Sequence, residues 1–133
     1  LGRKLLLRVS EIMRKREGVA VVAPEVNVPD VLEAMTRQRS GAAIVEGADG
    51  RLAGIFTHGD FVRSFRTMGA DVAGKQVREL MTEKPVSIEE GKLAVEVLAL
   101  LRAHRIDDLV VLNEAGEPVG MVDVQDLSRL GLL

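Results

Sequence analysis

The amino-acid sequence contains one unit twice, and this repeat constrains the fold more than any other feature. GIFTHGDFVR at 54–63 aligns with GMVDVQDLSR at 120–129, at an offset of 66 residues. The segments just before them, AAIVEGADGRLAG and DLVVLNEAGEPVG, align at the same offset. VSEIM at 9–13 matches VRELM at 77–81, at an offset of 68. Two tandem units therefore account for nearly all of the 133 residues.

Each unit predicts a strand, a helix, two strands joined by a hairpin turn, and a second helix. The first strands are expected at 19–23 and 85–88. In the first copy, Asn27 is placed to cap the helix that follows. The second helices are expected to begin near His58 and Val124. The sequence therefore predicts an α/β fold of two β-α-β-β-α repeats with pseudo-twofold symmetry.

The first helix of the second copy, expected over 92–104, is apolar nearly all round. Glu96 is its one polar residue between Leu93 and Leu101. A helix of this kind is covered on more than one side. One side is expected to pack on its own sheet, and the other to meet the first copy or a second chain. The simpler alternative is a core helix inside the monomer.

The composition excludes several classes of function. The chain is 47% hydrophobic but only 2% aromatic, so its core is aliphatic and it offers few rings on which bases could stack. Its net charge is −2, so no overall field recruits nucleic acid or anionic lipid. The absence of cysteine excludes disulfides and thiolate metal sites and fits a cytoplasmic protein.

The sequence predicts neither a membrane span nor a signal peptide. No apolar run approaches the roughly 20 residues of a membrane span. The opening LGRKLLLRV lacks the length and the cleavage site of a signal peptide, and it begins with Leu rather than Met. We expect a piece of a longer, cytoplasmic protein.

The motif GIFTHGD suits a nucleoside phosphate. A turn from a strand into a helix presents unpaired N–H groups that attract phosphate. Thr57 adds a hydroxyl donor, Asp60 can accept from both hydroxyls of a ribose, and Gly54 lets a flat base approach the strand. Ile55 and His58 complete the candidate nucleotide-binding residues. The alternative is purely structural, since Thr57 and Asp60 also resemble a capping box.

The second copy has a weaker version of this motif. Gly120 and Asp126 match the glycine and the aspartate of the first copy, but Asp123 stands where the first copy has Thr57. Aspartate caps a helix well, whereas its charge repels phosphate. Gly120, Asp123 and Asp126 are therefore candidates for a doubtful second site.

No residues form an enzymatic constellation. His58 and His104 lie in unlike settings, without the spacing of metal ligands, and no nucleophile elbow or Walker loop is present. Arg63 and Arg66 can reach a phosphate, although an exposed helix face is the simpler interpretation. RKRE at 14–17 is interpreted as a solvated connector. No catalytic residue, metal or cofactor is predicted.

With these repeats and the G-h-h-T-x-x-D pattern, the chain resembles a CBS-domain pair, or Bateman module, over roughly residues 9–131. In that family the Thr or Ser contacts phosphate and the Asp contacts ribose. The resemblance therefore implies these roles for Thr57 and Asp60, and only a ribose contact for Asp126. It also implies the following boundaries: a junction at 1–8, the first repeat at 9–68, a linker at 69–76 and the second repeat at 77–131.

Three segments are also similar to the C-terminal part of arabinose-5-phosphate isomerases. They are LGRKLLLRVSEIM, GIFTHGDFVRSF with the following MGADV, and VQDLSRLGLL. The resemblance implies a catalytic sugar isomerase (SIS) domain outside this sequence and a role in the synthesis of the lipopolysaccharide sugar Kdo. It implies AMP, ADP, ATP or CMP-Kdo as regulatory ligand, and a homodimer or larger homo-oligomer without nucleic-acid or membrane partners.

Two alternatives stay open. The chain can be an assembly module whose pockets are vestigial, as Asp123 and the apolar helix suggest. It can also be a CBS pair from another parent enzyme or transporter. A free-standing hydrolase is disfavoured, because no nucleophile and base can be named.

Overall fold

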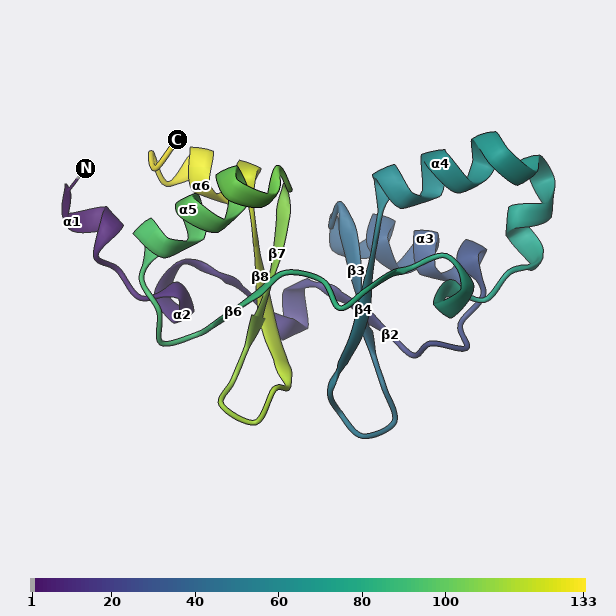
Figure 1. Ribbon diagram of the computed structural model, residues 1–133, viewed down its shortest axis with the longest axis horizontal. Coiled ribbons are helices and arrows are strands. Elements are labelled where there is room, and N and C mark those ends of the chain that lie inside the picture. The colour runs from purple at the N-terminus through teal and green to yellow at the C-terminus, as the bar shows by residue number, and fades with distance from the viewer. Residues whose placement is uncertain (1) are drawn as a thin grey trace. The chain divides into compact units, whose positions relative to one another are not determined.

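The computed structural model describes residues 2–133, which divide into two compact units (Figure 1). The first-repeat unit is Glu17–Pro85. The second-repeat unit is Val86–Leu133 together with the N-terminal segment that ends at Arg16. Each unit contains one four-stranded sheet with helices packed against it. The predicted α/β fold of two repeats is therefore confirmed.

In the first-repeat unit the strand order is β2-β3-β4-β5. β2 and β3 are parallel, and the other neighbours are antiparallel. The predicted order β-α-β-β-α is present, with β5 as an extra edge strand. The elements are β2 (Ala20–Val22), α3 (Val28–Gln38), β3 (Ala42–Glu46), β4 (Leu52–Thr57), α4 (His58–Met68), two 3-10 turns (Gly69–Gly74 and Val77–Glu79) and β5 (Thr82–Glu83).

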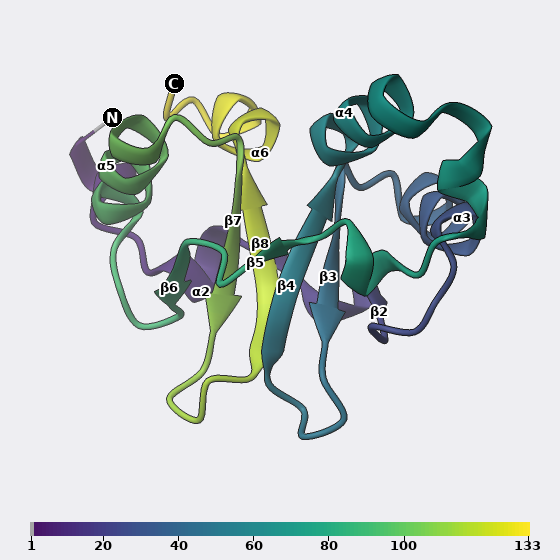
Figure 2. The same ribbon diagram turned by 45° about the vertical axis from the view of Figure 1, so that its right-hand side comes forward.

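In the second-repeat unit the strand order is β1-β8-β7-β6. β6 and β7 are parallel, and the other neighbours are antiparallel. Figure 2 shows α6 leaving the end of β8, as α4 leaves the end of β4 in the other unit. The elements are α1 (Gly2–Leu5), α2 (Val9–Ile12), β1 (Arg14–Lys15), β6 (Ser87–Glu89), α5 (Ala94–His104), β7 (Asp108–Leu112), β8 (Pro118–Asp123) and α6 (Val124–Arg129), and a 3-10 turn at Arg16–Gly18 follows β1.

The edge strand β1 corrects one prediction. RKRE was expected to be a solvated connector, but Arg14 and Lys15 pair with Met121 and Gly120 of β8. An edge strand forms through main-chain hydrogen bonds, so a charged dipeptide can serve as one. The compact units thus differ from the expected repeats: residues 9–16, assigned to the start of the first repeat, belong to the second-repeat unit.

Both cores are aliphatic, as the composition predicts. In the first-repeat unit Phe56 is the aromatic member of a core completed by Ala20, Val28, Val31, Met35, Ala43, Val45, Val72 and Val77. The core of the second-repeat unit comprises Val9, Ile12, Ile88, Ala94, Val97, Leu101, Leu109, Val111, Val122, Leu127 and Leu132. Each core anchors the strand from which a motif helix departs.

The cap of α3 differs from the prediction. Asn27 is the N-cap residue, but its side chain makes no capping hydrogen bond. Pro29, at the second helical position, has no N–H to donate. The N–H of Asp30 donates instead to the Asn27 carbonyl at 3.0 Å. The Asn27 side chain is thereby left without the two donors that it would normally cap.

The apolar helix α5 is covered within its own unit. Val97 and Leu101 are buried in the same core as Val9 and Ile12 of α2, and both α1 and α2 contact α5. The N-terminal segment therefore covers part of the side of α5 that does not face the sheet, while Ala99 and Ala103 are exposed. For its covered residues this matches the core-helix alternative, and the expected contact with a second chain stays a prediction. Val95 stays 41% exposed.

Candidate functional site

The motif at the end of β4 forms a capping box at the start of α4. Thr57 is the N-cap residue, and its Oγ1 accepts a hydrogen bond of 3.1 Å from the N–H of Asp60. Asp60 Oδ2 accepts one of 2.9 Å from the N–H of Thr57. The N–H of His58 donates to the Gly41 carbonyl at 3.1 Å. The structural interpretation of Thr57 and Asp60 as a cap is therefore confirmed, and part of the helix start is already paired.

The helix cap uses the Thr57 hydroxyl as an acceptor and leaves its hydrogen available to donate. A hydroxyl has one hydrogen to donate and two lone pairs that accept. Thr57 Oγ1 accepts from Asp60, and within residues 2–133 no acceptor for its own hydrogen is found. Capping a helix and donating to a ligand are therefore compatible roles for this side chain.

Asp60 is the buried carboxylate of the site, at 7% exposure. Its Oδ1 accepts a hydrogen bond of 2.7 Å from Arg63 Nη2 and one of 3.2 Å from Thr82 Oγ1. Thr82 Oγ1 also lies 3.4 Å from Asp60 Oδ2, the oxygen that accepts from the Thr57 N–H. Charged and neutral donors thus hold the carboxylate, and one of them, Thr82, lies on the edge strand β5.

Gly54 has a structural reason to be glycine. A Cβ there would lie 2.6 Å from Met81 Sδ and 2.8 Å from the Thr82 carbonyl oxygen. Gly54 and Ile55 pair with Glu83 and Thr82 of β5. The missing side chain therefore lets the edge strand approach closely. The expected contact between Gly54 and a base stays a prediction.

The exposed rim of the site carries basic side chains. His58 is exposed at the first position of α4. Arg63 extends back over the helix start: a Cβ added to Gly59 would lie 3.2 Å from Arg63 Nη1. The same added Cβ would lie 3.5 Å from Thr57 Oγ1. Arg66 is exposed in the last turn of α4, farther from the cap. Arg63 and the Thr57 hydroxyl therefore both border Gly59 at the start of α4.

The second motif has the same backbone frame with different charges. Asp126 N–H donates to Asp123 Oδ1 at 2.7 Å, and Asp123 N–H donates to Asp126 Oδ2 at 3.1 Å. The N–H of Val124 donates to the Asp107 carbonyl at 3.1 Å. Arg129 Nη2 lies 3.9 Å from Asp126 Oδ1. An ionised Asp123 caps as Thr57 does but has no hydrogen to donate.

The two carboxyl groups of this motif influence each other. Burial raises the pKa of the Asp126 carboxyl above its ordinary value, and the neighbouring Asp123 carboxyl adds to the rise. The backbone N–H of Asp123 and the positive charge of Arg14 act in the opposite direction on this pKa. The second motif is thus a site where additional negative charge is unfavourable.

Sequence reasoning missed Thr82 and Arg14. They occupy equivalent places in the two units. A Cβ added to Gly120 would lie 2.7 Å from Met13 Sδ and would also meet the Arg14 carbonyl. A Cβ added to Gly54 would meet Met81 and the Thr82 carbonyl in the same way. The signal is present in the repeat, since these residues follow the methionines of VSEIM and VRELM. They were missed because two-residue strands have no recognisable period.

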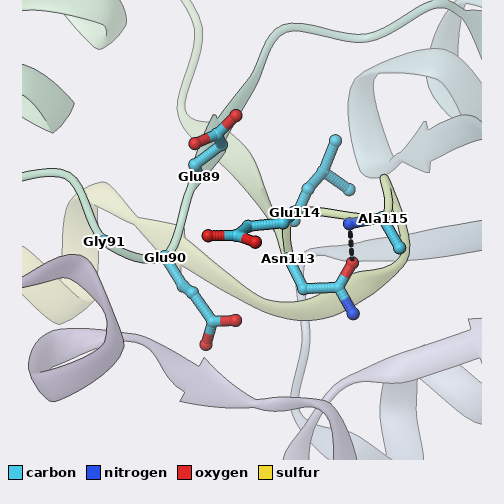
Figure 3. A pocket seen from close by; sticks show the side chains of 7 residues that line it. Glu89, Glu90, Gly91, Asn113, Glu114 and Ala115 are labelled. Carbon is cyan, nitrogen blue, oxygen red and sulfur yellow. Dashed lines mark hydrogen bonds between the residues drawn. The ribbon is translucent and has the colours of Figure 1, made fainter.

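A groove of about 480 Å³ lies elsewhere in the second-repeat unit, between the turn after β6 and the β7–β8 hairpin (Figure 3). It contains none of the candidate site residues, and three glutamates make it unsuitable for phosphate. Its lining is Glu89, Glu90, Gly91, Leu112, Asn113, Glu114 and Ala115.

The described part of the chain offers neither a metal-binding cluster nor a membrane-spanning helix. Over residues 2–133, no cluster of three or more His, Cys, Asp or Glu side chains is arranged to hold a metal ion. Over the same range, no helix has the length and apolar character needed to cross a bilayer.

Comparison with known proteins decides the family. The sequence profile of the CBS domain matches residues 9–67 and 77–132. The chain is a CBS-domain pair. Both matches contain a complete capping motif, at Thr57–Asp60 and Asp123–Asp126.

All 133 residues of this CBS pair align with part of arabinose 5-phosphate isomerase KdsD. Identity is 35% to the enzyme of Pseudomonas aeruginosa and 34% to that of Escherichia coli K12, both over 133 residues. The chain spans 40% of the length of these relatives. The remainder of those enzymes has no counterpart in the present sequence.

Solved structures support the CBS fold. CBSX2 in complex with AMP has a TM-score of 0.79 and 23% identity, covering 94% of this chain and 96% of that one. A conserved protein from Pyrococcus horikoshii has a TM-score of 0.85 and 24% identity, covering 96% and 93%. At these identities the likeness shows the fold of the CBS pair.

Proposed function

We propose that this CBS pair is the ligand-sensing regulatory part of a D-arabinose-5-phosphate isomerase. The parent chain would interconvert ribulose 5-phosphate and arabinose 5-phosphate for the synthesis of Kdo, with its catalytic residues in a SIS domain outside this sequence. Support for the parent comes from the 34–35% identity along the whole chain. In this proposal the 133 residues bind a regulator in the cytoplasm and catalyse nothing themselves.

One observation carries the ligand part of the proposal. The Thr57 hydroxyl caps α4 as an acceptor and keeps its hydrogen free, while the Asp60 carboxylate is buried beside it. The free hydroxyl and the start of an eleven-residue helix suit a phosphate group. The carboxylate suits the two hydroxyls of a ribose. A nucleotide presents both groups at neighbouring positions.

The proposed ligands are AMP, ADP and ATP, with the nucleotide sugar CMP-Kdo as a feedback signal from the pathway. The AMP complex of CBSX2 shows that a protein of this fold takes an adenine nucleotide. Gly54, Ile55 and His58 complete the proposed site in the first-repeat unit. The second motif is proposed as a weak or unused site, because Asp123 places a carboxylate where phosphate would bind.

The proposed mechanism is differential binding. A nucleotide that favours one arrangement of the CBS pair shifts the equilibrium between states of the attached catalytic domain. The coupling is reciprocal, so substrate on the catalytic domain changes nucleotide affinity by the same factor. No bond is made or broken in these 133 residues.

Calorimetric titration of the chain with AMP, ADP, ATP and CMP-Kdo tests the ligand proposal. We expect at least one of the four to bind and Asp60→Ala to abolish the binding, because the ribose loses its acceptor. Asp126→Ala is the matched control from the other motif and keeps the binding. Failure of all four compounds to bind would rule the sensing role out and leave the assembly role.

Assembly is the second candidate function, and α4 supplies the observation that favours it. Val62 is 52% and Phe65 50% exposed, and the Phe61 and Phe65 rings lie 5.9 Å apart. Adjacent exposed apolar side chains are typical of protein interfaces. We propose that a second copy of the chain covers them in a homodimer. Light scattering across a concentration series checks this: Phe65→Asp should lower the mass, and a wild-type monomer at every concentration would contradict the dimer.

A further inference from the structure

Arg63 connects the two halves of the proposed site. Its Nη2 pairs with Asp60 Oδ1 at 2.7 Å. The same guanidinium lies over Gly59, the glycine that the Thr57 hydroxyl also borders. One cation therefore touches the expected ribose acceptor and borders the expected phosphate position.

Asp60 is nearly saturated with donors in this arrangement. Its oxygens have about four acceptor sites and accept three hydrogens, from the Thr57 N–H, from Arg63 and from Thr82. A ribose that binds Asp60 through both of its hydroxyls must therefore displace at least one of these donors. The Thr57 N–H belongs to the helix cap and the Thr82 hydroxyl stays at its place on β5, whereas the long Arg63 side chain can move away from Asp60.

Arg63 is the donor that can leave. Its side chain is 71% exposed, whereas Asp60 is 8% exposed. The guanidinium end of this pair is in contact with water, so Arg63 is readily rehydrated when it leaves, and the ribose hydroxyls replace its hydrogen bond to Asp60. The guanidinium also binds phosphate through paired, charge-assisted hydrogen bonds.

We propose that Arg63 is the residue that makes the site prefer nucleotides over nucleosides, by exchanging one anion for another. Without ligand it pairs with Asp60. When a nucleotide binds, Arg63 releases Asp60 to the ribose and turns to the phosphate beside Thr57. A nucleoside displaces Arg63 from Asp60 but offers it no replacement. This inference rests on the proposed nucleotide binding and assigns a specificity role within that site.

The second motif lacks the conditions for this exchange. Arg129 is the equivalent arginine, 3.9 Å from Asp126 Oδ1 and 73% exposed. The Asp123 carboxylate stands where the Thr57 hydroxyl would be, so an arginine leaving Asp126 meets another carboxylate, and a phosphate there is repelled. Arg129 is therefore not assigned the role of Arg63.

The test is a calorimetric comparison of matched pairs, AMP with adenosine and CMP with cytidine, on wild type and Arg63→Gln. Loss of a charge-assisted contact to phosphate should weaken nucleotide binding by about tenfold or more. Nucleoside binding should stay the same or become tighter, because nothing competes for Asp60. The ratio of nucleotide to nucleoside affinity therefore falls. Arg66→Gln, on the same helix away from the cap, is the control and should leave both affinities unchanged.

Each other outcome overturns the assignment in a recognisable way. Equal weakening of nucleotide and nucleoside shows that Arg63 only supports the fold of the site, and unchanged affinities show that it is an ordinary surface residue. Both leave nucleotide sensing intact, because wild type still binds. If wild type binds neither member of either pair, the proposed function and the role of Arg63 fall together.

Discussion

The two capping motifs of this chain share a backbone and differ in charge. Both have an N-cap residue and an aspartate three positions later that bond to each other's N–H groups, and both aspartates are 7% exposed. The N-cap is Thr57 in one and Asp123 in the other. The motif can therefore be maintained by helix capping alone. The difference that concerns function is the hydrogen that threonine donates and ionised aspartate does not.

The edge strands extend this comparison. β5 places a neutral hydroxyl, that of Thr82, on Asp60. β1 places Arg14 at the equivalent position, where its charge acts on Asp126. The edge strand therefore adds a neutral donor to Asp60 and a positive charge near Asp126. A ribose in the second motif would in addition face the Asp123 carboxylate.

The two close-packed glycines give the strongest stability test of this equivalence. Gly54→Ala and Gly120→Ala each place a Cβ against an edge strand and a methionine sulfur. Overpacking of this kind costs about 1–3 kcal/mol, and we expect the Gly120 variant to cost more because the Arg14 carbonyl approaches more closely. Urea unfolding measures both. Gly74→Ala is the control, with no atom within 4 Å of the added Cβ. Two variants as stable as this control would show that the strands can move apart.

Neutralising the two aspartates should change the free energy of unfolding by smaller amounts, and in opposite directions for the two motifs. Asp60→Asn replaces one of two accepting oxygens by an NH2 group, so a donor from Thr57, Arg63 or Thr82 loses its acceptor, which should cost about 1–2 kcal/mol at pH 7. Asp126→Asn removes a buried charge next to Asp123 and should change stability by less than about 1 kcal/mol, in the stabilising direction.

The pH dependence gives the sign of the Asp126 effect. Because the folded pKa of Asp126 is raised, its protonated form is favoured on folding; the resulting stability is full below the unfolded pKa and is lost as pH rises through the folded pKa. The advantage of Asp126→Asn over wild type should therefore grow as pH rises from about 3.5 toward 7. Unfolding curves across this range measure it. An advantage that shrinks with rising pH would mean that the carboxylate is stabilising where it is.

The repeat made most of the fold predictable. The 66-residue offset located both hairpins and both motif helices, and α4 and α6 begin at His58 and Val124 as expected. Local patterns sufficed there because apolar runs and turn residues lie within each unit. The side-chain cap by Asn27 was wrong because Pro29 removes one donor.

The edge strands and their contribution to the site could not be read in the same way. Arg14–Lys15 and Thr82–Glu83 carry no apolar alternation, and β1 pairs with β8 near the other end of the chain. Thr82 and Arg14 were therefore absent from the predicted site. The covering of α5 by α1 and α2 was missed for a related reason, since it joins segments that are distant in sequence.

The decisive measurement is the number of nucleotides bound per chain by wild type, Thr57→Ser and Thr57→Asp, using whichever nucleotide binds wild type. All three residues cap a helix, so stability should change little. We predict one nucleotide per chain for wild type and for Thr57→Ser, which keeps the hydroxyl, and none for Thr57→Asp, which copies the second motif. Undiminished binding by Thr57→Asp, or two equal sites in wild type, would contradict the functional difference between the motifs.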